Sequence, residues 1–276
     1  MKSIFNLGLF REYLREDLTS FEYGFIKKVF SQAALGFAAF GAIVSILASV
    51  SKFDTHLGGA EAFWGILGIF AIASGLMFMF YYFPKYKNNP LDVRTPFVRN
   101  AYISLFFSYG TIFLLLLKGV SYISGGSSDQ HANLWVGLSI FGMTLIVYSI
   151  PASIGFFMKK HSKAVSLYKF LGFCYSAYLI LFLISLIGLI MGSVYEKISG
   201  YAHFALLILC GVIIFTSPIL SLYRMKTVVR YLDPQDAVVT KKWEVFFVFE
   251  ILAQLMQMAL YISRFVLYYC LGCSRR

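Results

Sequence analysis

The feature that most constrains this chain is a series of seven apolar stretches, each long enough to cross a lipid bilayer as a helix. A spanning helix needs about 20 mostly apolar residues, because backbone groups in lipid must pair within their own segment. Of all residues 59% are hydrophobic and only 13% are charged, whereas about a quarter of a soluble domain is charged. The sequence therefore predicts an all-α, polytopic membrane helix bundle of about seven transmembrane helices. The predicted spans are residues 29–50, 62–83, 98–118, 134–157, 167–192, 202–223 and 243–269.

The connectors between these stretches are short, which favours one compact bundle without a separate soluble domain. We expect a cytoplasmic amino-terminal segment over residues 1–28 and a seven-helix transmembrane domain over residues 29–270. A short basic tail over residues 271–276 completes the chain.

The distribution of lysine and arginine predicts the orientation. With seven spans, the amino terminus and the second, fourth and sixth loops carry 18 of these residues, against 6 on the opposite side. Cytoplasmic loops are enriched in positive charge, so the amino terminus is expected in the cytoplasm, in a bacterial inner membrane or a eukaryotic endomembrane. The basic tail "SRR" conflicts with seven full crossings unless the last segment turns back. Because the charges lie in short clusters between spans, nucleic acid is not an expected partner.

A polar stripe runs along the last span. Steps of four and three residues from Glu250 reach Gln254, Gln257, Tyr261 and Arg264, which share one helix face. An ionised side chain that faces lipid at mid-bilayer costs about 2.5 kcal/mol or more. The stripe is therefore predicted to face the bundle interior or a wet cavity.

Two interpretations of this stripe stay open. Glu250 either holds helices together as a hydrogen-bonded carboxyl, or belongs to an ion or proton path or a pH sensor lined by Gln254 and Gln257. Arg99, at the start of the third span, either snorkels to the membrane surface or reaches Glu250 across the bundle. Glu244 is interpreted as a solvated residue at the helix end, close to two lysines.

Prolines lie inside two predicted spans, Pro151 in "IVYSIPASIGFF" and Pro218 in "VIIFTSPILSLY". Each removes a backbone hydrogen bond and permits a kink, so each is either a fixed kink or a gating hinge.

Enzyme signatures are missing from the sequence. It contains no HExxH, no GxSxG, no phosphate-binding glycine loop and no pair of carboxylates within one span. Cys270 and Cys273 have CxxC spacing without a second pair, and the four histidines lack metal-ligand spacing. The expectation is a protein that is not an enzyme and has no cofactor and no metal site.

Several stretches resemble the Bax inhibitor (transmembrane Bax-inhibitor-motif) family. "FIKKVFSQAALGFAAFGAIVS" is similar to the start of that family's first span, and "PFVRNAYISLFFSYGTIF", with Arg99, to the start of its third. "LWVGLSIFGMTLIVYS" and "LGFCYSAYLILFLISLIGLIMGS" are similar to the fourth and fifth spans. "VFEILAQLMQMAL" places Glu250 where the family has an acidic residue in its final span.

The resemblance implies a pH-sensitive calcium or proton leak with a role in stress or cell-death control. The chain departs from the family pattern in the sixth span, where the family has an aspartate that pairs with the acid of the seventh. Here that stretch reads "IIFTSPILSLYRMK", with Thr216 or Ser217 at the nearest position. A switch that shares a proton between two carboxylates is therefore not expected.

The sequence thus predicts an integral membrane protein that leaks or senses cations, with Glu250 as the titratable group. Its expected partners are the lipid bilayer and calcium or protons. The first alternative is a non-conducting membrane scaffold whose polar stripe binds the helices of a membrane-protein partner, and a third option is a small-solute transporter.

Overall fold

A computed structural model describes residues 18–50, 60–123, 130–158, 161–191 and 196–274, and these residues form helices and short turns without any strand. Seven of the helical segments are long and apolar enough to cross a membrane, which confirms the predicted polytopic bundle. The helices are α2 (Ser20–Val50), α3 (Ala60–Met77), the π-helix η1 (Phe78–Tyr82), α4 (Phe83–Asn88), α5 (Thr95–Ile123), α6 (Gln130–Phe157), α7 (His161–Met191), α8 (Glu196–Arg230) and α9 (Ala237–Ser274). The segment from α3 to α4 forms one span.

Local capping makes some helices longer than the apolar stretches predict. α2 begins at Ser20, inside the predicted amino-terminal segment, because Thr19 and Glu22 form a capping box. The Glu22 amide donates to Thr19 Oγ1 at 3.3 Å, and the Thr19 amide donates to Glu22 Oε2 at 3.0 Å. At α9, the Val239 amide donates to Asp236 Oδ1 at 3.0 Å. Most of the predicted amino-terminal segment and the last two residues of the basic tail lie outside the described residues.

The second span changes its winding at η1. The Phe83 amide bonds to the Phe78 carbonyl, five residues back, and Pro84 follows directly. Proline has no N–H, and its ring clashes with the carbonyl four residues before it, so a wider turn relieves the conflict. The span therefore continues through the proline to Asn88.

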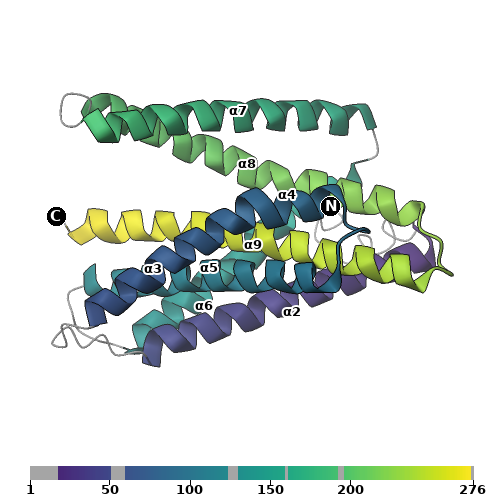
Figure 1. The fold of residues 1–276 in the computed structure, drawn as a ribbon, viewed down its shortest axis with the longest axis horizontal. Helices are drawn as coiled ribbons and strands as arrows, with labels where there is room; N and C mark the ends of the chain where they lie inside the picture. The colour runs from purple at the N-terminus through teal and green to yellow at the C-terminus, as the bar shows by residue number, and fades with distance from the viewer. Residues whose placement is uncertain (1–17, 51–59, 124–129, 159–160, 192–195, 275–276) are drawn as a thin grey trace, which may run out of the picture.

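Helix α9 forms the centre of the bundle. It packs against α2, α5, α6 and α8, whereas α7 packs chiefly on α8 and α3 chiefly on α5 (Figure 1). In the apolar stretch of α9, 72% of the residues are buried, compared with 11% in the second span and 6% in α7. The outer helices therefore present their apolar side chains to lipid, and α9 is shielded from it.

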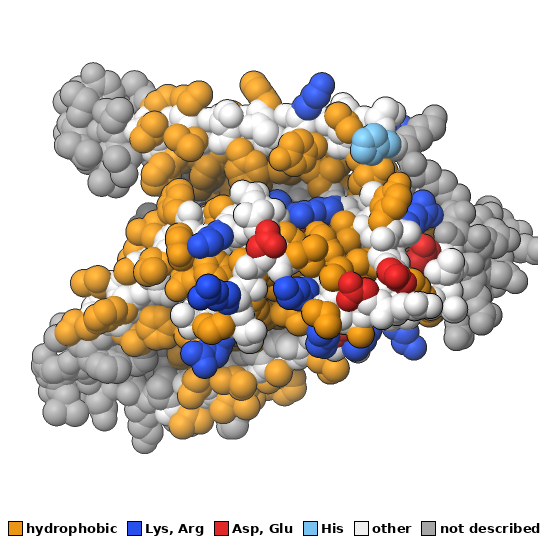
Figure 2. Space-filling model, turned by 45° about the vertical axis from the view of Figure 1, so that its right-hand side comes forward, with side chains coloured by type: hydrophobic (Ala, Val, Ile, Leu, Met, Phe, Trp, Pro, Cys, Tyr) orange, Lys and Arg blue, Asp and Glu red, His pale blue; other side chains and the backbone are white. Residues whose placement is uncertain are grey.

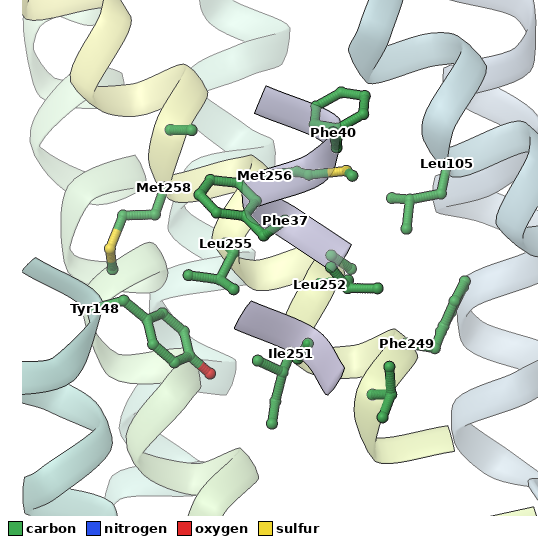
Figure 3. Close-up of a cluster of buried hydrophobic side chains, with 14 of the residues drawn as sticks. Phe37, Phe40, Leu105, Tyr148, Phe249, Ile251, Leu252, Leu255, Met256 and Met258 are labelled. Carbon is green, nitrogen blue, oxygen red and sulfur yellow. The ribbon is translucent and has the colours of Figure 1, made fainter. Parts of the chain in front are cut away.

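The core is built from aromatic and aliphatic side chains of α2, α5, α6 and α9. Phe37 and Phe40 of α2 pack beside Leu252, Leu255 and Met256 of α9 (Figure 3). The α2–α6 contact is close at Gly41, where a Cβ would come within 2.5 Å of the Phe141 ring.

Successive spans run in opposite directions, so alternate connections meet at one end of the bundle. The start of α2, the α4–α5 turn and the α8–α9 turn lie at this end, where lysine and arginine gather (Figures 1 and 2). We call it the basic end. Its residues include Lys27, Lys28, Lys85, Lys87, Arg94, Arg99, Lys163, Arg224, Lys226, Arg230, Lys241 and Lys242.

Candidate functional site in the central helix

The polar stripe of α9 faces the interior of the bundle. Glu250 is 1% exposed and Gln254 is 5% exposed, and Gln257 is only partly exposed. This placement agrees with the expectation that such a stripe avoids lipid. Glu250 lies seven residues beyond Trp243, or about 10 Å deeper in the bundle at 1.5 Å per residue.

The carboxyl group of Glu250 lacks a full set of partners. Its Oε2 atom is buried and makes no hydrogen bond, and no ion pair joins Glu250 to another described residue. Arg99 is exposed near the start of α5 and does not contact Glu250 across the bundle. The position of Arg99 therefore agrees with snorkelling, the first of its two predicted placements.

The glutamines of the stripe bind three surrounding helices. Gln254 accepts a hydrogen bond from the Tyr148 hydroxyl of α6 at 3.0 Å and donates to Ser217 Oγ of α8 at 3.4 Å. Gln257 forms a side-chain hydrogen bond with Tyr109 of α5. These contacts fix the rotation of α9 within the bundle.

The Gln254–Ser217 contact also sets the register between α8 and α9, which run antiparallel. One turn closer to the basic end, Glu250 lies four residues before Gln254 in α9, and Ser221 lies four residues after Ser217 in α8. This register therefore places Ser221 opposite Glu250. Ser221 is 4% exposed, and its Oγ atom is also buried without a hydrogen bond. Two unsatisfied polar groups therefore belong to the same level of one helix interface.

We define the Glu250 cluster as Glu250, Gln254, Tyr148, Ser217 and Ser221. The Tyr148 hydroxyl also lies within electrostatic range of Glu250. Glu250 and Gln254 were predicted from the sequence, and Ser217 was named there as one of the two residues nearest to the family's paired aspartate, whereas Tyr148 and Ser221 were missed. Tyr148 and Ser221 resemble ordinary span residues in the sequence, and only the packing of α6 and α8 on α9 brings them close to the carboxyl group.

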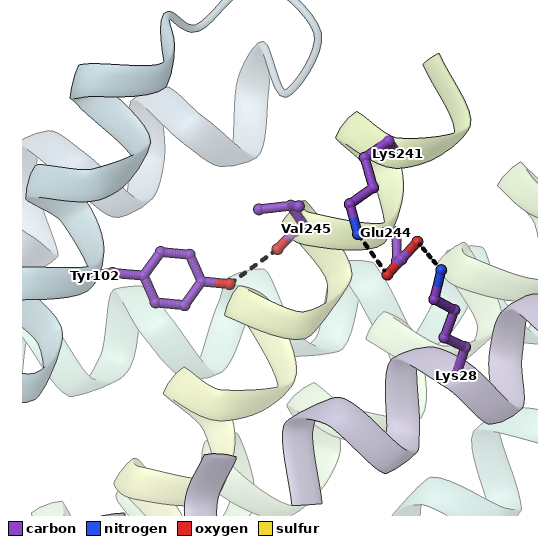
Figure 4. A network of polar contacts seen from close by, with 5 residues as sticks. All are labelled: Lys28, Tyr102, Lys241, Glu244 and Val245. Atoms are coloured by element: carbon purple, nitrogen blue, oxygen red, sulfur yellow. Dashed lines mark hydrogen bonds and ion pairs between the residues drawn. The ribbon is translucent and has the colours of Figure 1, made fainter. Parts of the chain in front are cut away.

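Glu244 is not solvated, contrary to the sequence interpretation. It is 3% exposed and forms ion pairs with Lys28 of α2 at 3.0 Å and with Lys241, one turn earlier in α9, at 2.9 Å (Figure 4). Gln32 adds a further side-chain hydrogen bond. The interpretation was wrong because α2 covers this face of α9 and supplies two of the three partners.

Both prolines lie within continuous helices and are buried. Pro218 stands next to Ser217, and one residue further the Ile219 backbone closely approaches Gly155 of α6. A Cβ at Gly155 would lie 2.3 Å from the Ile219 carbonyl oxygen, so α8 packs tightly beside the proline. Pro151 is enclosed in α6. A hinge function for either proline stays a prediction.

An apolar groove between α2 and α6 approaches the Glu250 cluster from outside. It has a volume of about 400 Å³ and is floored by Tyr148, Ile251, Leu222 and Leu255. Glu250 does not line this groove. Tyr148 therefore stands between the groove and the polar cluster, with its ring on one and its hydroxyl on the other.

Among the described residues, no three histidine, cysteine, aspartate or glutamate side chains come together as a metal site would require. The side chains of Cys270 and Cys273 lie outside the description. Comparisons with protein-family models, with curated proteins and with solved structures find no match. The inference of function therefore depends on the geometry of the chain itself.

Proposed function

We propose that this integral membrane protein is a gated, pH-sensitive cation leak or sensor in which the Glu250 cluster takes up and releases a proton. The observation that carries the proposal is the buried Glu250 carboxyl, which has an unsatisfied oxygen and no positive partner among the residues that the structure describes. The pH-sensitive leak implied by the resemblance to the Bax inhibitor family agrees with this assignment, and we propose membership of that family on the same residues.

The energetics of burial favour two states for this carboxyl. An ionised carboxylate without a partner is strongly disfavoured in a low-dielectric interior, so the group either binds a proton or is compensated by a cation. The Ser221 hydroxyl, placed opposite by the helix register, is suited to bind either form, because a hydroxyl can donate to a carboxylate or accept from a carboxylic acid. Protonation would thus be coupled to contacts between α8 and α9.

Flux through this site requires movement, because core side chains and the Tyr148 ring surround the cluster. We propose that deprotonation of Glu250 opens the α8–α9 interface, since the charge gains stability when it becomes hydrated. Pro218 lies beside Ser217 in α8 and is the proposed hinge, because its missing N–H weakens the helix at that turn. Pro151, in α6, is a second and less direct candidate.

The chemistry of the cluster favours protons over calcium. Calcium takes six to eight oxygen ligands, usually with several carboxylates among them. The Glu250 cluster has one carboxylate, one amide and three hydroxyl groups, and the amide oxygen of Gln254 already accepts a bond from Tyr148. Calcium flux is therefore measured as the second possibility in the experiment below. A link to stress response follows only from the resemblance to the Bax inhibitor family.

The test uses the purified full chain in liposomes that contain a pH-sensitive dye or a calcium dye. We expect proton flux above that of empty liposomes, with a pH dependence between pH 5 and 8 that Glu250→Gln abolishes. Asp92→Asn is the matched control, because Asp92 is an exposed carboxylate in the α4–α5 turn.

Absence of flux at every pH would overturn the leak and favour the non-conducting scaffold. Gln254 and Gln257 already bind helices of the same chain, so a scaffold would use another surface, such as the exposed faces of α3 and α7. A membrane-protein partner that co-purifies in mild detergent, and that remains bound when both glutamines are changed to leucine, would support that alternative.

A further inference from the structure

The groove between α2 and α6 forms where these two helices diverge. Far from the basic end they touch closely, with ring centroids of Phe37 and Phe141 5.3 Å apart and with Gly137 against Ser45. Toward the basic end they separate, and the groove opens between the Tyr23–Ala34 segment and the Leu145–Phe157 segment. Because α9 and α8 form its floor, the groove is closed at the back and open on its outer side.

The length of the groove matches one leaflet of a bilayer. The α2 segment spans 11 residue steps and the α6 segment 12, which correspond to about 17 and 18 Å at 1.5 Å per residue. Half of a hydrocarbon core about 30 Å thick is about 15 Å. The groove thus runs from the membrane surface at the basic end to a level near the middle of the bilayer.

The lining of the groove is apolar except at its rim. Ser149 and Ser153 donate their hydroxyls to carbonyls of their own helix, Ile146 and Ser149, so neither hydroxyl offers its hydrogen to an occupant. None of the described residues that line the groove carries a carboxylate. This lining suits a hydrocarbon chain.

Positive charge stands at the basic end of the groove. Lys27 lines the rim, is exposed and makes no ion pair with the described residues, whereas the adjacent Lys28 is bound to Glu244. Lys226 adds a second positive charge close by, with its Nζ atom 5.4 Å from the centre of the Phe156 ring. An anionic headgroup at the membrane surface would lie within reach of Lys27, which can extend toward the surface from its helix.

We propose that the groove between α2 and α6 binds one acyl chain of an anionic phospholipid from the leaflet at the basic end. The phosphate would sit at Lys27 and the chain would lie against Tyr148. The observations that carry the proposal are the length that matches one leaflet, the apolar lining and the exposed Lys27 at the rim. The proposal does not depend on ion flux or on the proton chemistry of Glu250.

The experiment places the full chain in lipid nanodiscs with a phosphatidylglycerol that carries a photoreactive diazirine at the end of one acyl chain. After illumination, peptides that carry the lipid are identified by mass spectrometry. We expect labelling of the groove segments of α2 and α6 well above labelling of α7, whose faces are also exposed to lipid. Unlabelled phosphatidylglycerol should compete about five-fold better than phosphatidylcholine, and Lys27→Gln should remove that preference.

Two neighbouring substitutions on α6 keep the result interpretable if a variant folds poorly. Ser149→Phe fills the groove and should abolish groove labelling, whereas Ile150→Phe adds the same ring on a surface exposed to bulk lipid and should not. Equal labelling of α7 and the groove, or equal effects of the two substitutions, would overturn the proposal. Glu250→Gln should leave the labelling unchanged, so failure of the proposed leak would not be confused with failure of lipid binding.

Discussion

Two buried glutamates of α9, Glu244 and Glu250, lie six residues apart and differ in every partner. Glu244, nearer the basic end, has two lysines and a glutamine around its carboxylate. Glu250, deeper in the bundle, has an unsatisfied oxygen, and the helix register inferred from the Gln254–Ser217 contact places the unsatisfied Ser221 at its level. Both residues are at most 3% exposed, so burial alone does not distinguish them.

The two glutamates differ in whether nearby cations compensate the negative charge of the carboxylate. The ion pairs of Glu244 compensate its charge, and its lysines keep more than half of their surface in water, so the pairs need little desolvation on the cationic side. Glu250 has no such compensation from the described residues, and an unpaired ionised carboxylate is costly in a low-dielectric interior. A compensated buried carboxylate can remain ionised in the folded protein, whereas we propose that an uncompensated one binds and releases a proton.

The largest expected effect comes from removing both cations of Glu244. Lys28→Met combined with Lys241→Met should lower the free energy of unfolding by about 2–3 kcal/mol, because a buried carboxylate is left unpaired. The measurement is reversible unfolding in mixed detergent and denaturing detergent micelles. Lys27→Met is the control, since this neighbour forms no ion pair within the described part of the chain, and its free energy of unfolding should stay within about 0.5 kcal/mol of wild type.

Adding Glu244→Gln to the double substitution should restore most of the loss, because the unpaired charge disappears. If the double substitution costs no more than Lys27→Met, the ion pairs of Glu244 do not stabilise the fold, and the contrast with Glu250 fails.

The next effect concerns the helix that faces Glu250. Gly155→Ala should cost about 2 kcal/mol, because its Cβ would meet the rigid Ile219 carbonyl at 2.3 Å and push α8 away from α6. Gly142→Ala, on the same helix, has open space around its Cβ and is expected to be neutral or slightly stabilising. Equal stabilities for the two variants in unfolding experiments would show that α8 is not held tightly beside the Glu250 cluster.

The sequence predicts those features of this structure that depend on neighbouring residues in the chain, and it does not predict contacts between distant segments. Apolar stretches long enough to span lipid identify all seven spans. Because polar groups are costly in lipid, Glu250 and Gln254 were expected to face the bundle interior, and both are buried there. The partners of Glu244 could not be predicted, because Lys28 and Gln32 belong to a helix far away along the chain. Ser221 could not be identified from the sequence, because only the register between α8 and α9 places it opposite Glu250. The capping box at Thr19 was readable from its spacing and was overlooked in favour of hydropathy.

An isosteric exchange at each glutamate should give opposite signs. Glu244→Gln removes both ion pairs but leaves lysines that water can solvate, so a loss of about 1 kcal/mol is expected. Glu250→Gln removes a group that is costly when ionised, so the free energy of unfolding at neutral pH should be unchanged or rise by up to about 1 kcal/mol. A larger loss at Glu250 than at Glu244 in the same unfolding assay would reveal a stabilising partner for Glu250 and remove the basis of the proposed switch.

The smallest expected effect tests the serine that the helix register places opposite Glu250. Ser221→Ala removes a buried hydroxyl that makes no hydrogen bond, so stability should change by less than about 0.5 kcal/mol. Ser104→Ala is the matched comparison, because Ser104 Oγ donates to the Ser74 carbonyl at 2.8 Å, and its loss should cost about 1 kcal/mol. If Ser221 acts with Glu250, its alanine variant should nevertheless shift the pH dependence of proton flux, which Ser104→Ala should leave in place. A stable Ser221→Ala variant with a wild-type pH profile would confine the proposed switch to Glu250 and its contacts with Gln254 and Tyr148.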